Sequence, residues 1–216
     1  MSNARERMIA RAAGEIAPGM VVNLGIGLPT KVVEYLAPDC AVCLHTENGL
    51  TGIGPRLAPD RADRNLIDAG GAYVSTVPGS AFFDSATSFA MVRSGRLDLT
   101  MLGAFEVSAG GDLANWKIPG KFSPGVGGGI ELAQKARRVV VLTTHTDRQG
   151  NPKLKAECSL PLTARGCVAR VFTDMAVVDV TPQGFVLREI AKGLCAQDVI
   201  EATDAPLLVA DDLQYF

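Results

Sequence analysis

The stretch most informative about chemistry runs from Leu44 to Pro55, where one carboxylate, Glu47, separates an apolar segment from a glycine-rich one. Residues 41–45 are predicted to form a short buried strand, and Asn48-Gly49 and Gly54-Pro55 are turn signals. Glu47 is therefore expected at the carboxyl end of a strand, where α/β proteins place reactive groups. A glutamate there could be a general base, a metal ligand or a covalent nucleophile. The alternative is that Glu47 caps the turn and faces water, as most loop glutamates do.

Two further glycine segments raise the question of anion binding. Gly125-x-Gly127-Gly128-Gly129 precedes a predicted helix, and consecutive N–H groups at such a position can stabilise an oxyanion, although a flexible hinge would have the same composition. Gly25-x-Gly27 follows a predicted strand, as a dinucleotide-binding loop does. However, Thr30 stands where the third glycine belongs, and Pro29 lacks an N–H donor. A tight structural turn is the better interpretation of this second segment.

Other reactive side chains give weaker signals. Cys40-x-x-Cys43-x-His45 superficially resembles a metal-binding cluster, but positions 43 and 45 share one face of a strand and position 40 does not, so no metal site is expected. His145 and Asp147 follow an apolar strand and could line a pocket, yet turn capping is favoured for both. The sequence has no Gly-x-Ser-x-Gly motif, which argues against a serine hydrolase of that kind.

Length and composition favour one globular domain spanning residues 1–216, because 47% of the residues are hydrophobic. The net charge of −2 and the lack of Lys/Arg clusters argue against a nucleic-acid partner. The first 17 residues lack the apolar run of a signal peptide, and no segment has the 18 or so apolar residues of a membrane span. We therefore expect a cytoplasmic protein, without a membrane partner, whose five cysteines are reduced thiols.

The elements that must position Glu47 are predicted from hydrophobic periodicity. Near-continuous apolar strands alternate with short helical patterns, which predicts an α/β fold with an open, mainly parallel sheet covered by helices on both faces and a strand-rich C-terminal part. Residues 103–129 are expected to form an ordered loop layer. Helices are predicted from a cap at Ser2 or Asn3 to Pro18-Gly19 and at 29–36, 84–93, 130–136 and 196–202, and strands at 20–24, 41–45, 73–77, 97–102, 139–143, 167–172, 176–180, 185–190 and 207–210.

The segment Glu47-Asn48-Gly49, followed by Gly52-x-Gly54-Pro55, resembles the active-site segment of family I CoA-transferases. The resemblance is to the β subunit of the 3-oxoacid CoA-transferases and spans about residues 5–190. The chain departs from the family pattern at His45-Thr46 and at Gly128-Gly129-Ile130-Glu131. The further segments that are similar to the family, in the same order, are 22–29, 77–84, 112–116, 118–121, 125–129, 160–163 and 173–177.

This resemblance implies an enzyme that moves coenzyme A between carboxylic acids through a covalent glutamyl-CoA thioester. It implies that Glu47 is the nucleophile and that Gly128 presents a backbone N–H to the acyl-glutamate, with Gly127 fixing the turn. Asn48 would contribute to substrate binding, and Gly25 and Gly27 would form a wall for the pantetheine arm of CoA. No cofactor and no metal is implied, because CoA thioesters are the substrates.

The resemblance also implies a partner, the α subunit, which supplies the other half of the active site, with a heterotetramer (α2β2) as the expected assembly. Acetoacetate, 3-oxoadipate, butyrate, acetate and succinate all remain open as acids. Two alternatives stand beside the transferase: an acyl-CoA hydrolase of the same superfamily, in which water replaces the acceptor acid, and a non-catalytic ligand-sensing domain on the same fold.

Overall fold

The computed structural model describes residues 3–37, 39–123 and 125–216. The strands of the main sheet are β1 (Val21–Leu24), β2 (Cys43–Thr46), β3 (Leu50–Arg56), β4 (Val74–Phe82), β5 (Leu99–Leu102), β8 (Val139–Leu142), β10 (Val168–Phe172), β11 (Ala176–Thr181), β12 (Gly184–Ile190) and β13 (Leu207–Tyr215). A small second sheet contains β6 (Glu106–Ser108), β7 (Leu113–Ala114) and β9 (Leu154–Lys155). The helices are α1 (Ala4–Ala13), η1 (Pro29–Tyr35), η2 (Pro59–Arg61), α2 (Ser85–Arg93), α3 (Gly129–Lys135) and α4 (Ala196–Glu201).

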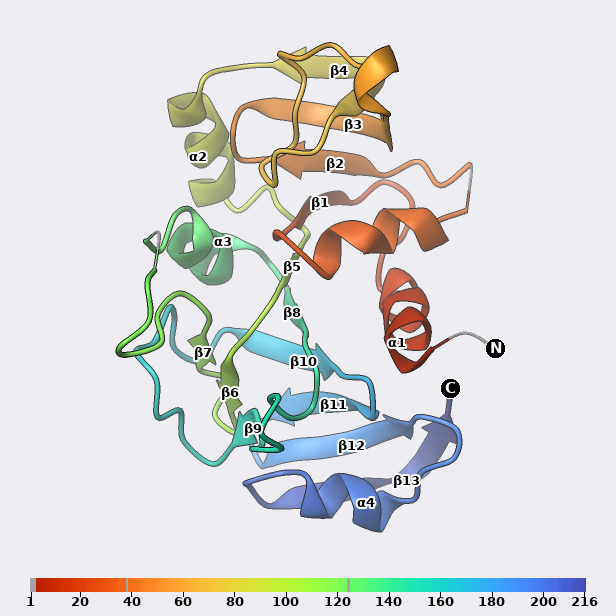
Figure 1. Ribbon diagram of the computed structural model, residues 1–216, viewed down its shortest axis with the longest axis vertical. Helices are drawn as coiled ribbons and strands as arrows, with labels where there is room; N and C mark the ends of the chain where they lie inside the picture. The colour runs from red at the N-terminus through yellow and green to blue at the C-terminus, as the bar shows by residue number, and fades with distance from the viewer. Residues whose placement is uncertain (1–2, 38, 124) are drawn as a thin grey trace.

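The main sheet has ten strands in the order β13-β12-β11-β10-β8-β5-β1-β2-β3-β4, and it runs the length of the molecule (Figure 1). Its centre, from β10 through β8, β5 and β1 to β2, is parallel throughout. Antiparallel strands flank this centre on both sides, while the last pair, β12 and β13, is again parallel. The predicted mainly parallel sheet and its strand-rich C-terminal part are confirmed.

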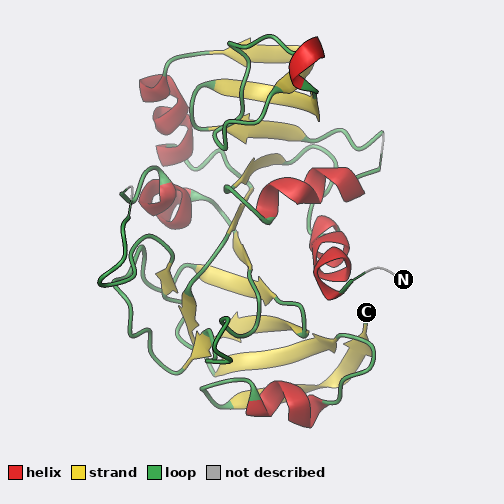
Figure 2. Ribbon diagram, viewed as in Figure 1, coloured by secondary structure: helices red, strands yellow, loops and turns green. Residues whose placement is uncertain are grey.

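Helices cover both faces of the parallel centre, and the apolar strands divide their side chains between two cores. On β8, Val139 and Val141 pack in the core beneath α2 and α3, whereas Val140 and Leu142 pack in the core beneath α1 and η1. Figure 2 shows these two helix pairs on opposite sides of the strands. A strand buried on both faces must be apolar at every position, which explains the uninterrupted apolar runs of the sequence.

The glycine-rich segment after Glu47, in which Gly54-Pro55 was interpreted as a turn, forms strand β3 from Leu50 to Arg56 instead, so that interpretation is wrong. The pairing of β3 with β4 is broken by register shifts between Thr51 and Ile53 and between Ile53 and Arg56. A Cβ at Gly52 would lie 2.9 Å from the Cα of Ser80. Glycines inside a strand mark bulges and close backbone approach. Here they let two irregular strands pack closely.

The other differences concern the ends of elements. β4 continues through Pro78-Gly79 to Phe82, because β4 is an edge strand and an edge tolerates a proline that cannot donate to the ladder. The segment from Pro29 is a 3-10 helix. Asn3 caps α1, as predicted, whereas Ser2 lies outside the described residues. β13 extends past the predicted end at 210 to Tyr215. Among the described residues, no helix combines the length and apolarity that crossing a bilayer requires.

Candidate active site

Glu47 lies in the three-residue turn Glu47-Asn48-Gly49 that joins β2 to β3. The turn is closed by the pairing of Thr46 with Leu50 and by the N–H of Gly49, which donates to the carbonyl oxygen of Thr46 at 3.1 Å. Gly49 has a φ of 122°, and a Cβ there would overlap the carbonyl oxygen of Phe83. Only glycine fits this position. The turn thereby holds Glu47 at the carboxyl end of a buried parallel strand.

The two carboxylate oxygens of Glu47 have different surroundings. The Nδ2 of Asn23, a fully buried residue of β1, donates to Oε2 at 3.0 Å. Within the described residues, Oε1 accepts no hydrogen bond from the protein, and the side chain is partly exposed. One oxygen is therefore anchored while the other is available to react. This is the arrangement that a carboxylate nucleophile needs, since its orientation is fixed without both oxygens being occupied.

The backbone of the second glycine segment passes beside Glu47. Gly128 is the N-cap residue of α3, and a Cβ at this position would lie 3.6 Å from the Cγ of Glu47 and 2.9 Å from the ring of Phe89 on α2. Gly127 has a φ of 54°, in the left-handed region that favours glycine. The structure therefore brings Gly128 against Glu47, although the two residues are far apart in the sequence.

A buried polar network behind Glu47 was not predicted as a site. The Nδ2 of Asn23 also lies 3.3 Å from the Nδ1 of His45, and the hydroxyl of Thr100 donates to the Oδ1 of Asn23 at 3.5 Å. The Nε2 of His45 lies 2.9 Å from the Oγ of Ser88, on α2. In the register of the sheet, Asn23 is opposite His45 on one side and Thr100 on the other. In the sequence, Asn23, His45 and Thr100 are visible only as polar residues in otherwise apolar strands. Their proximity could be recognised only once the order of the strands was known.

The protonation of His45 follows from its surroundings. Its side chain is buried, which lowers its pKa below the ordinary value of 6.5, and the nearby negative charge of Glu47 opposes this effect only in part. His45 is therefore neutral at pH 7, and it adds no positive charge next to the carboxylate of Glu47.

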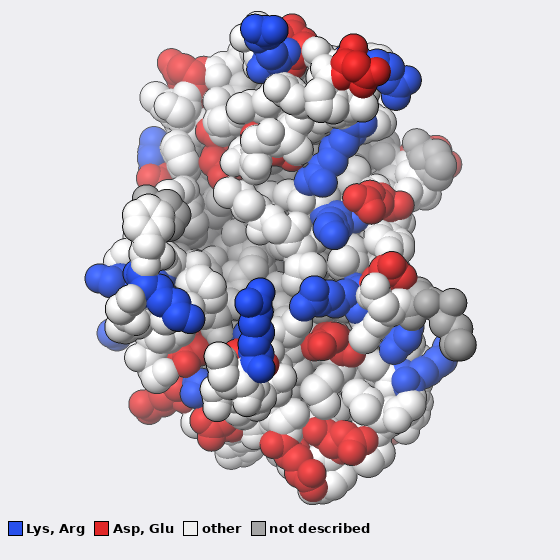
Figure 3. Space-filling view, viewed as in Figure 1, with Lys and Arg blue, Asp and Glu red and all other residues white. Residues whose placement is uncertain are grey.

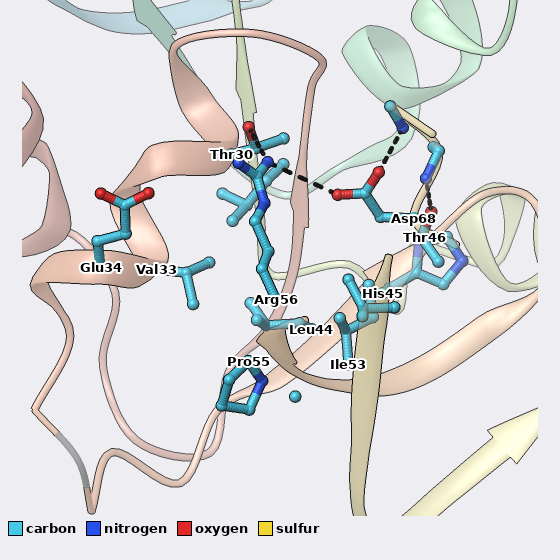
Figure 4. Close-up of a pocket in the computed structure, with 15 residues that line it drawn as sticks. Thr30, Val33, Glu34, Leu44, His45, Thr46, Ile53, Pro55, Arg56 and Asp68 are labelled. Carbon is cyan, nitrogen blue, oxygen red and sulfur yellow. Dashed lines mark hydrogen bonds and ion pairs between the residues drawn. The ribbon is translucent and has the colours of Figure 1, made fainter. Parts of the chain in front are cut away.

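A cavity of about 350 Å³ lies on the other side of β2, between η1, β3 and the segment 68–70 (Figure 4). Arg56 extends across it, donating to the Oγ1 of Thr30 at 2.8 Å and lying 3.7 Å from the carboxylate of Asp68. The hydroxyl of Thr46 accepts from the N–H of Ala69 at 2.9 Å. Glu47 is not among the described residues that line the cavity. The cavity reaches the turn only through the two β2 residues before Glu47, His45 and Thr46, which form part of its wall.

The remaining predicted site residues lie around this turn and this cavity. Asn48 is exposed, and its Nδ2 donates to the carbonyl oxygen of Ile67 while its Oδ1 accepts from Thr46. The N–H of Gly25 donates to the carbonyl oxygen of Met101 at 2.8 Å, and Gly27 has a φ of 97° in an exposed loop. That loop connects two cavity-lining positions, 24 and 30. Neither glycine is itself among the residues that line the cavity, but the loop that contains them runs between two residues that are.

The prediction for His145 was wrong. His145 is fully buried rather than capping a turn: its Nδ1 and Nε2 each lie 2.9 Å from a hydroxyl, those of Thr173 and Thr203. Asp147 does cap the following turn, since its Oδ1 accepts from the N–H groups of Gln149 and Asn151. All five cysteines are free thiols. No group of three or more His, Cys, Asp or Glu side chains within 3–37, 39–123 and 125–216 could hold a metal ion.

Comparison with known proteins gives one consistent family. The family model described as Coenzyme A transferase matches residues 5–202. The chain is 48% identical over 205 residues to the β subunit of a probable coenzyme A transferase of Bacillus subtilis, covering 95% of this chain and 94% of that protein. It is 46% identical over 213 residues to one subunit of a probable succinyl-CoA:3-ketoacid coenzyme A transferase of the same organism, covering 99% of each.

A solved structure has the same fold as this chain. An acyl-CoA transferase from E. coli O157:H7, crystallised as a thioester complex with CoA, matches with a TM-score of 0.80 at 24% identity. The match covers 100% of this chain and 43% of that one. At this identity the likeness shows the shared fold, and it confirms the α/β architecture expected from the sequence.

Proposed function

This chain belongs to the coenzyme A transferase family, and on that premise we propose that it transfers CoA from an acyl-CoA to a 3-oxo acid or a related carboxylic acid through a thioester on Glu47. The enzyme class expected from the sequence, a CoA-transferase, is confirmed by the family. The observation that carries the proposed mechanism is the carboxylate of Glu47: Asn23 donates to Oε2, no described protein group donates to Oε1, and the side chain lies close to the backbone of Gly128.

The proposed reaction needs only anions as nucleophiles and leaving groups. The free oxygen of Glu47 attacks the thioester carbonyl of the acyl-CoA, and the C–S bond breaks to release CoA thiolate and leave a mixed anhydride. The thiolate then attacks the γ-carbonyl of Glu47, and the donor acid leaves as its carboxylate. A glutamyl-CoA thioester remains, and an acceptor carboxylate reverses the two steps to form the new acyl-CoA. Each step balances without proton transfer, so neither a general base nor a metal ion is required.

What the protein must supply is placement and stabilisation of an oxyanion. Each attack makes a tetrahedral centre next to Glu47, and the N–H of Gly128 is proposed to donate to its oxyanion, because the backbone at 128 approaches the Glu47 side chain closely. The left-handed conformation of Gly127 sets the path of that backbone. Asn48 would then contribute indirectly to substrate binding, since its hydrogen bonds attach the turn to the segment around Ile67.

The pantetheine arm of CoA is proposed to pass along the loop that contains Gly25 and Gly27. That loop is at the border of the cavity, and apolar side chains such as Val33 and Ile53 line the cavity's wall. The partner is proposed to be an α subunit, since both Bacillus relatives are named as one subunit of an enzyme. The names of the relatives favour 3-oxo acids as acceptors, and the protein is proposed to act in the cytoplasm.

The proposal is tested by trapping the intermediate. The chain, co-purified with its α subunit, is incubated with acetoacetyl-CoA or succinyl-CoA without an acceptor acid, and then treated with borohydride, which reduces a thioester but not a carboxylate. Mass spectrometry of the digested chain is expected to find an alcohol in place of the carboxyl group of Glu47. Glu47→Ala is expected to abolish both the adduct and turnover. Glu47→Asp is expected to lower turnover at least about a hundredfold, because it withdraws the nucleophile by one methylene.

Glu201→Ala is the matched control, since Glu201 is an exposed glutamate on α4. It is expected to keep both adduct and rate. A Glu47→Ala enzyme that retained its transferase rate would refute the mechanism. Release of free CoA at the same rate with and without an acceptor acid would instead identify an acyl-CoA hydrolase.

A further inference from the structure

The imidazole of His45 is held in one tautomer by its two neighbours. Its Nδ1 faces the Nδ2 of Asn23 at 3.3 Å, and because an amide nitrogen only donates, Nδ1 must be the unprotonated acceptor. The proton is therefore on Nε2, which donates to the Oγ of Ser88 at 2.9 Å. All three side chains are at most 2% exposed, so water does not substitute for these partners. The ring of Phe83 stacks against His45 at a centroid distance of 6.4 Å and further restricts it.

The Asn23 amide is oriented first by the Glu47 carboxylate and the carbonyl oxygen of His45, because both of these groups only accept, and the unprotonated Nδ1 of His45 adds a third acceptor on the same side. With Nδ2 towards Glu47, one amide hydrogen reaches the carboxylate and the other lies between the Nδ1 and the carbonyl oxygen of His45. On the opposite side, Oδ1 accepts from the hydroxyl of Thr100. A flipped amide would place its oxygen against three acceptors: the carboxylate, the imidazole nitrogen and the carbonyl. Unpaired acceptors in a buried site are costly, so the flip is suppressed.

We propose that His45, anchored by Ser88, is a positioning residue for the nucleophile, which keeps the Asn23 amide turned so that it holds one oxygen of Glu47 and leaves the other free. His45 does not touch the reacting atoms in this scheme and exchanges no proton. The inference rests on the proposed role of Glu47. In it, His45 of β2 and Ser88 of α2 help to orient the Glu47 carboxylate, in addition to the turn that carries Glu47.

The test compares three variants of the enzyme co-purified with its α subunit. His45→Leu removes both hydrogen-bonding atoms from the buried site, and Ser88→Ala removes the anchor. His45→Gln keeps one acceptor and one donor within a side chain of similar length. Misplacement of a nucleophile by about 1 Å can cost a factor of about 10². His45→Leu is therefore expected to lower kcat and the rate of borohydride trapping by about 10–100-fold, with KM for acyl-CoA changed less than about threefold.

Ser88→Ala is expected to give a smaller loss in the same two rates, and His45→Gln to restore both to within about fivefold of the wild type. His145→Leu is the matched control for stability, because His145 is an equally buried histidine bonded to two hydroxyl groups, and its kcat per folded molecule is expected to be unchanged. Circular dichroism and thermal unfolding establish the folded fraction of each variant.

A folded His45→Leu enzyme with wild-type kcat and trapping rate would overturn the inference. So would a loss that His45→Gln does not restore, since that would trace the effect to packing rather than to hydrogen bonds. Glu47→Ala distinguishes failure of the proposed nucleophile from failure of the positioning role of His45. If that variant is active, the proposed mechanism fails; if it is inactive while His45→Leu is fully active, only the positioning role fails.

Discussion

At the scale of single residues, the glycines of the site are needed for two different physical reasons. Gly49 and Gly127 have positive φ values, which other residues adopt only with strain. Gly128 has an ordinary φ of −77°, so its backbone conformation suits any residue. A side chain is excluded there by space, because a Cβ would lie 2.9 Å from the ring of Phe89. The absence of a side chain at 128 is thus a requirement of close packing against Phe89, while a Cβ there would meet the Cγ of Glu47 at an ordinary contact distance of 3.6 Å.

This distinction predicts the effect of Gly128→Val. The added methyl groups would press on Phe89 and on Glu47, displacing the carboxylate and covering the N–H proposed to stabilise the oxyanion. Turnover is expected to fall by about 10²–10³-fold, while overpacking lowers the free energy of unfolding by only about 1–3 kcal/mol. Gly129→Ala is the control, because its Cβ would meet only ordinary contacts, at 3.8 Å from Thr163. Steady-state kinetics and thermal unfolding of both variants measure these two effects. An unaltered rate and stability in Gly128→Val would contradict a catalytic role for the N–H of Gly128.

At the scale of elements, His145 joins the end of β8 to the segment after α4 through Thr203. Burial lowers its pKa from 6.5 to about 4. The unfolded chain therefore binds a proton at this residue below pH 6.5 that the folded protein does not accept until about pH 4. The contribution of His145 to the free energy of unfolding is fully present above pH 6.5. It decreases by about 3 kcal/mol in total as the pH falls from 6.5 to 4.

His145→Gln is expected to remove this part of the pH dependence while lowering stability at every pH. Urea unfolding of the wild type and the variant at pH 7 and pH 4.5 measures it, because the contributions of other groups cancel in the difference between the two proteins. The gap in free energy of unfolding should be larger at pH 7 than at pH 4.5. An equal gap at both pH values would show that His145 is not the titrating group.

The strands of the sheet also show which parts of the fold could be predicted from the sequence. The alternation of apolar runs and helical patterns was sufficient to predict the strands of the parallel centre, because strands buried on both faces, such as β8, are apolar throughout. It failed for β3, where glycines that let two strands approach were indistinguishable from loop glycines. Glu47 and Gly128 were predicted as site residues from local composition and family resemblance, and the structure brings the two close together. Asn23, His45 and Ser88 were not assembled into a network, because their proximity depends on strand order and helix placement.

At the scale of the whole molecule, three large apolar side chains are exposed on segments that adjoin elements of the candidate site. Phe82 pairs with Leu50, directly after the turn, and its side chain is 68% exposed. Ile26 follows β1, the strand of Asn23, and is 69% exposed, while Phe122, in the segment leading to Gly128, is 94% exposed. On the face in Figure 3, acidic and basic side chains are interspersed. Large exposed apolar side chains of this kind are typical of an interface, and the occupant we expect is the α subunit.

This interface predicts which substitutions separate the two subunits. The double variant Phe82→Ser/Phe122→Ser is expected to raise the dissociation constant for the α subunit at least about tenfold, as measured by co-elution in size-exclusion chromatography over a range of concentrations. The reason is that large buried aromatic side chains dominate interface free energies. Leu208→Ser is the matched control: Leu208 is 51% exposed on β13, at the opposite edge of the sheet (Figure 1). Because the lone chain provides Glu47 but only one side of the expected cleft, it should show no more than residual activity, and full transferase activity from the 216-residue chain alone would contradict the need for a partner.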